Sequence, residues 1–127
     1  KLVSHKEYRL VEAKIVLNVR AVTPLISIVD IQGEITSSAE VALADAYIRA
    51  GNAKYIVLNF SGLEYMNSSG IGLLVTLLIR AKRQGQKLLA FGLTDHYREI
   101  FELTRLNEVI ALYAAEVDAL ASVEVAT

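Results

Sequence analysis

Apolar residues in the first part of the chain follow patterns typical of strands. Runs rich in β-branched residues predict strands over 13–20 and 25–31. The only proline, Pro24, lies between these runs and predicts a turn that pairs the two strands antiparallel. Gly33 is expected to end the second strand.

A helix is predicted next, over residues 36–50. Ser37 and Glu40 have the spacing of a capping box, in which each side chain satisfies a backbone N–H of the other residue. Gly51 is expected to stop the helix in a left-handed conformation. The predicted core side of this helix consists of Val41, Leu43, Ala44, Tyr47 and Ile48.

Strands and helices alternate in the remainder of the chain. This alternation predicts parallel strands joined by right-handed crossovers. The predicted fold class is therefore α/β, with a mixed sheet that is mostly parallel, an antiparallel N-terminal edge, and helices packed against it. The expected elements are a strand over 54–60 followed by a polar turn, a helix from Ser68 to Arg83, a strand over 87–93, a helix capped by Thr94 or Asp95, a strand over 109–113 and a helix over 115–123.

The helix that begins at the two serines has distinct sides, because successive helical residues advance by about 100°. Ser69 falls on its polar side, whereas Ser68 points nearer the apolar side and is the better candidate for the N-cap. Plain capping by serine is the simpler interpretation of the pair. The alternative is a phosphate switch at Ser69, since the N–H groups and dipole of a helix N-terminus favour negative charge. The predicted polar stripe is Gly72, Thr76, Arg80 and Arg83, and the predicted apolar side is Ile71, Leu74, Val75 and Leu78.

Composition narrows the class of protein. The 127 residues correspond to one domain, and the apolar fraction of 54% predicts either deeply buried helices or an apolar surface that a partner covers. A net charge of −1 argues against binding to nucleic acid or to an anionic membrane. The longest apolar run, 71–79, is too short to cross a bilayer, so no membrane insertion is expected. The absence of cysteine and of a signal peptide fits a cytoplasmic protein.

The motifs of common enzyme classes are missing, so neither catalysis nor a cofactor nor a metal is expected. His5 and His96 have no neighbouring carboxylate or cysteine that completes a metal set. The serines lack a nucleophile elbow, and neither a P-loop lysine nor a dinucleotide fingerprint is present. A phosphoryl-receiver domain needs several acidic residues at strand ends, and only Asp30 is available.

The segment Asn67-Ser68-Ser69-Gly70-Ile71-Gly72 resembles the D-S-S-G-[LI]-G signature of STAS domains of the anti-sigma-factor antagonist family. Gly33-Glu34-Ile35-Thr36 lies where that family has G-E-[LI]-D. The segments 56–63 and 101–106 are also similar to family motifs. The resemblance covers roughly residues 12–120 of a single domain, and residues 1–11 are interpreted as a lead-in or an extra strand.

This resemblance implies a bacterial partner-switching regulator with the mixed sheet described above. Members of the family bind a kinase-type anti-sigma factor of the GHKL class, which phosphorylates a serine, and a PP2C-type phosphatase reverses the change. By position in the motif, Ser69 is the phosphate acceptor. A homodimer is also possible. The expected partner-binding surface consists of Thr36, Asn67, Ser68, Gly70, Gly72, Thr76 and Arg80.

The chain departs from the family pattern at two positions. Asn67 replaces the aspartate of the signature, and Thr36 replaces the aspartate of G-E-[LI]-D. Loss of these two charges either eases phosphorylation or removes a group that orients the serine for the kinase. The alternative function is a STAS scaffold or transporter-associated module that is never phosphorylated.

Overall fold

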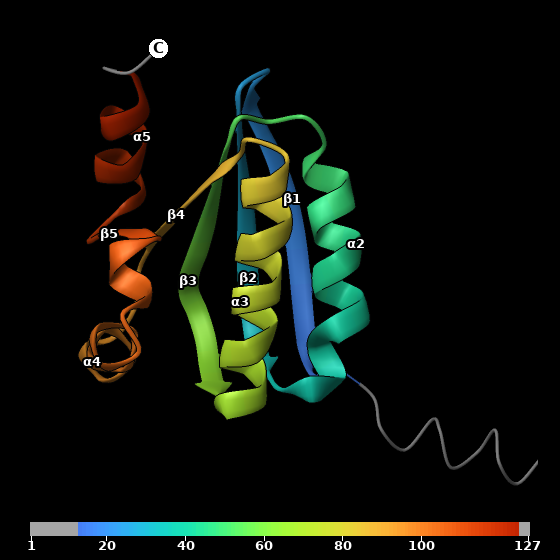
Figure 1. Cartoon of the computed structure of the whole chain (residues 1–127), viewed down its shortest axis with the longest axis vertical. Coiled ribbons are helices and arrows are strands. Elements are labelled where there is room, and N and C mark those ends of the chain that lie inside the picture. Colours follow the sequence, from blue (N-terminus) through green and yellow to red (C-terminus); the bar gives the residue numbers. More distant parts are fainter. Residues whose placement is uncertain (1–12, 125–127) are drawn as a thin grey trace, which may run out of the picture.

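The described part of the chain, residues 13–124 of a computed structural model, contains one sheet with the strand order β1-β2-β3-β4-β5. The first two strands pair antiparallel and all later neighbours pair parallel, which confirms the predicted mixed sheet (Figure 1). The expected lead-in at 1–11 lies outside the described residues. The elements are β1 Ile15–Thr23, β2 Ile26–Ile35, η1 Ser37–Ala39, α2 Glu40–Ala50, β3 Tyr55–Met66, α3 Ser68–Arg83, β4 Lys87–Phe91, α4 Asp95–Leu103, η2 Leu106–Glu108, β5 Ala111–Tyr113 and α5 Glu116–Glu124.

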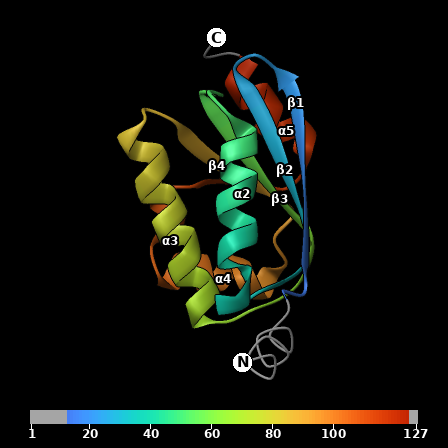
Figure 2. The same ribbon diagram turned by 90° about the vertical axis from the view of Figure 1, so that its right-hand side faces the viewer.

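Helices cover both faces of the sheet, as parallel strands require. Figure 2 shows α2 and α3 on one side of the strands and α5 on the other. The larger apolar core lies under α2, α3 and α4 and includes Leu58, Leu74 and Phe101. The smaller core lies under α5 and includes Val57 and Val123. Alternate residues of β3 therefore enter different cores.

Two strands are longer than the sequence pattern predicted. β2 continues past Gly33 to Ile35, and β3 continues through the expected polar turn to Met66. The extensions pair with each other in parallel. The pairing register shifts between Asp30 and Gln32 and again between Gly33 and Glu34. Gly33 has a φ of 109°, and a Cβ atom there would lie 2.2 Å from the carbonyl oxygen of Lys14. The glycine thus permits the close approach of the backbone at Lys14, just before β1, and does not end the strand.

The predicted core side of α2 is wrong in part. Val41 and Ile48 are 80% and 67% exposed, while Leu43 and Tyr47 are buried as expected. The helix rotates so that Leu43, Tyr47 and two alanines, Ala46 and Ala50, face the sheet. Small residues allow the helix to approach the strands closely, and the two bulkier residues consequently face outward. Gly51 ends the helix at the predicted place and has a positive φ of 67°, but its ψ of −138° lies outside the left-handed helical region that was expected.

The predicted apolar side of α3 also needs correction. Its buried residues are Gly70, Leu74, Leu77 and Ala81, whereas Val75 is 37% exposed. Ile71 and Leu78 are half-buried. In the C-terminal part of the chain, Thr94 caps α4 as expected by accepting a hydrogen bond from the Tyr97 N–H. The final strand and helix are confirmed, although the strand begins two residues later than predicted and the helix is shifted by one residue toward the C-terminus.

Candidate functional site

Thr36 and Asn67 lie side by side just beyond the C-terminal ends of β2 and β3. Each follows directly after the last paired residues of two parallel strands, Ile35 in β2 and Met66 in β3. The backbone N–H of Asn67 donates to the Ile35 carbonyl oxygen at 3.4 Å. The fold therefore brings together the two positions at which the chain departs from the family pattern, and α3 begins beside them.

Asn67, not Ser68, is the N-cap of α3. Its backbone is extended, and its side-chain Oδ1 accepts a hydrogen bond from the Gly70 N–H at 3.0 Å. The sequence-based assignment of the cap to Ser68 is therefore wrong by one residue. Ser68 and Ser69 form the first two positions of the helix, and both are exposed.

A second cap lies next to the first. Thr36 Oγ1 accepts a hydrogen bond from the Ser38 N–H at 3.4 Å, and the hydroxyls of these two residues are 2.9 Å apart. Thr36 thus caps the short helix η1 that leads into α2. The predicted capping box between Ser37 and Glu40 is not formed, because Ser37 already lies inside η1. The asparagine and the threonine each retain the capping role that an aspartate would fill.

Ser69 occupies an electrostatically favourable place for an added anion. The N–H groups of Ser68 and Ser69 have no acceptor within residues 13–124, since Asn67 satisfies the N–H of Gly70 instead. The first turn of α3 carries no acidic residue, and the last turn carries three basic ones. The first turn of α3 therefore supplies no negative charge of its own to the positive end of the helix dipole, beside Ser69.

The two glycines of the serine motif serve different purposes. A Cβ atom on Gly70 would lie 2.0 Å from the Ile35 carbonyl oxygen, so the fold itself requires glycine there. A Cβ atom on Gly72 would meet nothing within 4 Å. Glycine inside a helix costs about 1 kcal/mol relative to alanine. The packing of this domain therefore does not explain Gly72, whose bare backbone faces solvent.

The remaining predicted contact residues extend along α3. Thr76 is exposed, and its hydroxyl donates to the Gly72 carbonyl oxygen at 3.1 Å. Arg80 is half-buried, with its guanidinium carbon 4.6 Å from the centroid of the Tyr47 ring on α2. Ser69, Gly72 and Thr76 thus share one exposed stripe, and Arg80 is turned toward the neighbouring helix.

Tyr97 of α4 contacts the backbone just before the Asn67 cap, and sequence analysis did not assign it to the site. Its hydroxyl accepts a hydrogen bond from the Met66 N–H at 2.9 Å, and the side chain is buried. This contact fixes the residue that precedes the Asn67 cap. A buried tyrosine needs a partner for its hydroxyl, which is a general signal for such a contact, but the sequence does not indicate the partner.

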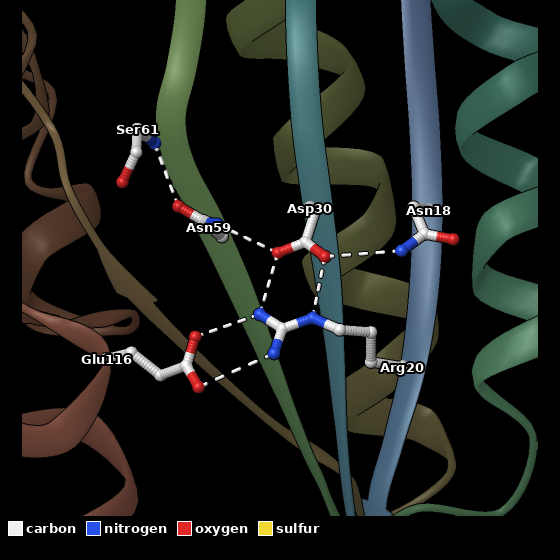
Figure 3. Close-up of polar contacts among 6 residues, drawn as sticks. All are labelled: Asn18, Arg20, Asp30, Asn59, Ser61 and Glu116. Carbon is white, nitrogen blue, oxygen red and sulfur yellow. Dashed lines mark hydrogen bonds and ion pairs between the residues drawn. The ribbon is translucent and has the colours of Figure 1, made fainter.

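A second polar cluster lies on the opposite face of the sheet, and sequence analysis missed it. Arg20 donates two hydrogen bonds to Asp30, at 2.7 and 2.8 Å, and bonds Glu116 of α5 at 2.8 Å (Figure 3). Asn59 also donates to Asp30, at 2.8 Å. Hydrogen bonds from Arg20, more than any other contact, lower the pKa of Asp30 below its ordinary value. These carboxylates raise the pKa of Arg20 in turn.

This pairing rules out Asp30 as the centre of a phosphoryl-receiver site. The carboxylate lies inside β2, five residues before the strand ends at Ile35, and both of its oxygens bind the arginine. Among residues 13–124 no group of three or more histidine, cysteine, aspartate or glutamate side chains is placed to hold a metal ion. No helix in the described part of the chain has the length and apolar character needed to cross a membrane.

Comparison with known proteins agrees with the geometry. The sequence model of the family described as "STAS domain" matches residues 14–119. A curated relative, the anti-sigma-B factor antagonist of Listeria monocytogenes, is 29% identical over 59 residues, which cover 46% of this chain and 52% of that protein. The chain thus spans about half the length of the curated relatives it matches.

Solved structures show the same fold over most of the chain. An anti-sigma factor antagonist from Mycobacterium paratuberculosis is 26% identical and has a TM-score of 0.71. The superposition covers 89% of this chain and 98% of that one. A sulfate transporter family protein from Wolinella succinogenes is 16% identical and has a TM-score of 0.68. The superposition covers 85% of this chain and 93% of that one. The second likeness concerns the fold alone.

Proposed function

Because this chain belongs to the STAS domain family, we propose that it is an anti-sigma-factor antagonist that switches partners through phosphorylation of Ser69. The unphosphorylated protein binds an anti-sigma factor of the GHKL kinase class, and a PP2C-type phosphatase restores it after modification. The names of the Listeria and Mycobacterium proteins support the antagonist role.

The main observation behind this proposal is that one residue caps α3 while a different residue, Ser69, is exposed in its first turn. Asn67 performs the cap, so the Ser69 hydroxyl is exposed beside two N–H groups without described acceptors. A phosphate adds a charge of about −1.5 to −2 and three acceptor oxygens. The helix N-terminus accommodates that charge, and the fold tolerates the modification.

The partner responds differently to the same charge. The exposed stripe around Ser69 is neutral, with Gly72 and Thr76 following along α3. A partner that packs closely against this neutral stripe loses affinity when a phosphate must be desolvated at the contact. Gly72 supports such a contact, because its lack of a side chain lets another backbone approach the helix. Phosphorylation therefore releases the anti-sigma factor.

The direct test is phosphorylation in vitro, using each GHKL-type anti-sigma kinase of the source genome with ATP and reading the result by intact mass. We expect a single phosphate on wild type and on Ser68→Ala, and none on Ser69→Ala. Ser68→Ala is the matched control, since it removes an equally exposed hydroxyl from the same turn. Phosphate mapped to Ser68, or retained in Ser69→Ala, would contradict the assignment.

The second candidate function is a STAS scaffold or transporter-associated module without phosphorylation. Two observations favour it, namely the neutral side chains at Thr36 and Asn67 and the fold shared with the Wolinella protein. The two functions differ in one result. A folded wild type that none of these kinases labels, and that still binds one of them with the same affinity as Ser69→Glu, would favour the scaffold.

A further inference from the structure

A groove of about 800 Å³ surrounds the N-terminal end of β4. It arises because β5 pairs only with Leu89–Phe91 of β4, which leaves Lys87 and Leu88 without a strand on that side among the described residues. The groove lies at the C-terminal end of α3, about 20 Å along the helix from Ser69. It is therefore separate from the serine site. Its apolar walls include Leu78, Ile79, Leu88, Leu89, Val109 and Val123.

Three lysines give one end of this groove a positive charge. Lys82 and Lys87 line it directly. Lys54 is adjacent, because the Lys87 N–H donates to the Lys54 carbonyl oxygen at 2.9 Å. The Lys54 Nζ atom lies 5.7 Å from the centroid of the ring of Tyr55, which also lines the groove.

This charge is not neutralised within the described part of the chain. None of the three lysines forms an ion pair with a carboxylate of residues 13–123. The acidic residue that lines the groove, Glu108, pairs with Arg105 at 3.0 Å. Lys82 also complements the negative end of the α3 dipole, but Lys54 and Lys87 lie at the starts of strands and have no such role.

We propose that this groove binds a single-chain anionic amphiphile of the fatty-acid type. The apolar tail packs along the walls formed by α3, β4 and α5, and the carboxylate lies between Lys82 and Lys87. The volume is within the range of about 300–1,000 Å³ for small-molecule sites, and such sites combine apolar walls with a few polar anchors. The proposal does not depend on phosphorylation of Ser69.

The test uses laurate below its micelle-forming concentration, with calorimetry for affinity and amide chemical shifts for location. We expect saturable binding with shifts at residues 78–89 and 109–123. Lys82→Gln combined with Lys87→Gln is expected to weaken binding by roughly tenfold, the effect of losing two partly solvated ion pairs. Arg83→Gln removes a neighbouring charge outside the groove and is expected to bind as wild type does.

A second variant tests the groove without changing charge. Ala111 is exposed and lines the groove, so Ala111→Phe fills the space without disturbing the core and is expected to abolish binding. Dodecanol is expected to bind at least several-fold more weakly than laurate, because it lacks the anion. The proposal is wrong if laurate does not bind the wild type, if the double lysine variant and Arg83→Gln bind equally, or if the shifts map to Val41 and Ile48 on α2.

Discussion

The side-chain Oδ1 of Asn67 lies 3.0 Å from the Gly70 nitrogen, and this hydrogen bond begins α3. Asn67→Ala is therefore expected to lower the free energy of unfolding by about 1 kcal/mol, the usual cost of losing an N-cap. Ser68→Ala is expected to change it by only a few tenths, since Ser68 caps nothing in the described structure. Urea denaturation of both variants measures the difference. A larger loss in Ser68→Ala than in Asn67→Ala would show that the serine is the cap.

Gly70 and Gly72 offer a matched pair of glycine-to-alanine changes in one helix. Gly70→Ala forces a methyl group against the Ile35 carbonyl oxygen and is expected to destabilise the protein by about 3 kcal/mol or more, as severe overpacking does. Gly72→Ala is expected to stabilise it by up to about 1 kcal/mol through helix propensity. Thermal unfolding of the two variants measures whether each change lowers or raises the stability of the protein.

Gly72→Ala also tests the proposed contact surface. If a partner backbone packs against Gly72, the stabilised variant should bind the anti-sigma factor at least several-fold more weakly than wild type. Titration calorimetry with the kinase identified by phosphorylation measures this affinity. Unchanged affinity together with higher stability would mean that the partner does not approach Gly72 closely.

The cluster around Arg20 predicts how stability depends on pH. Hydrogen bonds from Arg20 hold the pKa of Asp30 below its ordinary value of 3.8. A carboxyl whose pKa is lower in the folded protein stabilises the fold above the unfolded value, and this contribution is lost as pH falls through the folded pKa. Unfolding free energies measured from pH 3.8 downward should therefore decrease on acidification. Asp30→Asn and Arg20→Gln should each flatten this decrease, and a slope identical to wild type in both would contradict the assignment.

Sequence periodicity identified the order of the main strands and helices because most of them carry an apolar pattern of several residues. It misplaced the N-caps of η1 and α3, since a cap depends on which residue adopts an extended backbone, and neighbouring polar residues such as Asn67 and Ser68 are equally suitable by type. It also missed the extension of β3, because Ser61–Tyr65 is polar and is held as a strand by pairing with β2. The contact between Arg20 and Glu116 joins residues 96 positions apart, which no local pattern reveals.

The serine site was predicted in more detail because a family motif specified it. The motif named Thr36 and Asn67 as neighbours of Ser69, and the strand register places these two side by side. It gave no information about Tyr97, whose hydroxyl fixes Met66 from another helix. Phosphorylation of Ser69 remains a prediction. So does the role in partner binding of Thr36, Asn67, Ser68, Gly70, Gly72, Thr76 and Arg80.

Phosphate mimicry at Ser69 is expected to separate folding from binding. Ser69→Glu places a negative charge at a helix N-terminus and should leave the free energy of unfolding unchanged or slightly higher. Its affinity for the anti-sigma kinase should fall by about tenfold or more, because the neutral contact must then bury a charge. Ser69→Gln has a similar size without the charge and is the control. Equal losses in both variants would indicate a steric rather than an electrostatic effect.

Restoring the two acids of the family pattern is expected to change the switch but not the fold. In Asn67→Asp a carboxylate oxygen can accept the same hydrogen bond from Gly70, and in Thr36→Asp a carboxylate can cap η1. The free energy of unfolding of the double variant should therefore stay within about 1 kcal/mol of wild type. The two added carboxylates can act in opposite directions on the phosphorylation of Ser69.

If the acids orient the serine for the kinase, wild type is phosphorylated slowly and the double variant faster. If they act only by repulsion, each opposes the phosphate by about 1 kcal/mol at a partly solvated site, and the double variant is phosphorylated more slowly and dephosphorylated faster. We expect the first outcome, because Thr36 and Asn67 lie together at the ends of β2 and β3, where α3 and its two serines begin. Rates of phosphorylation and dephosphorylation, measured side by side with Asn67→Asp alone as an intermediate, decide between the two. A wild type that its kinase labels quickly and completely would refute the expected outcome.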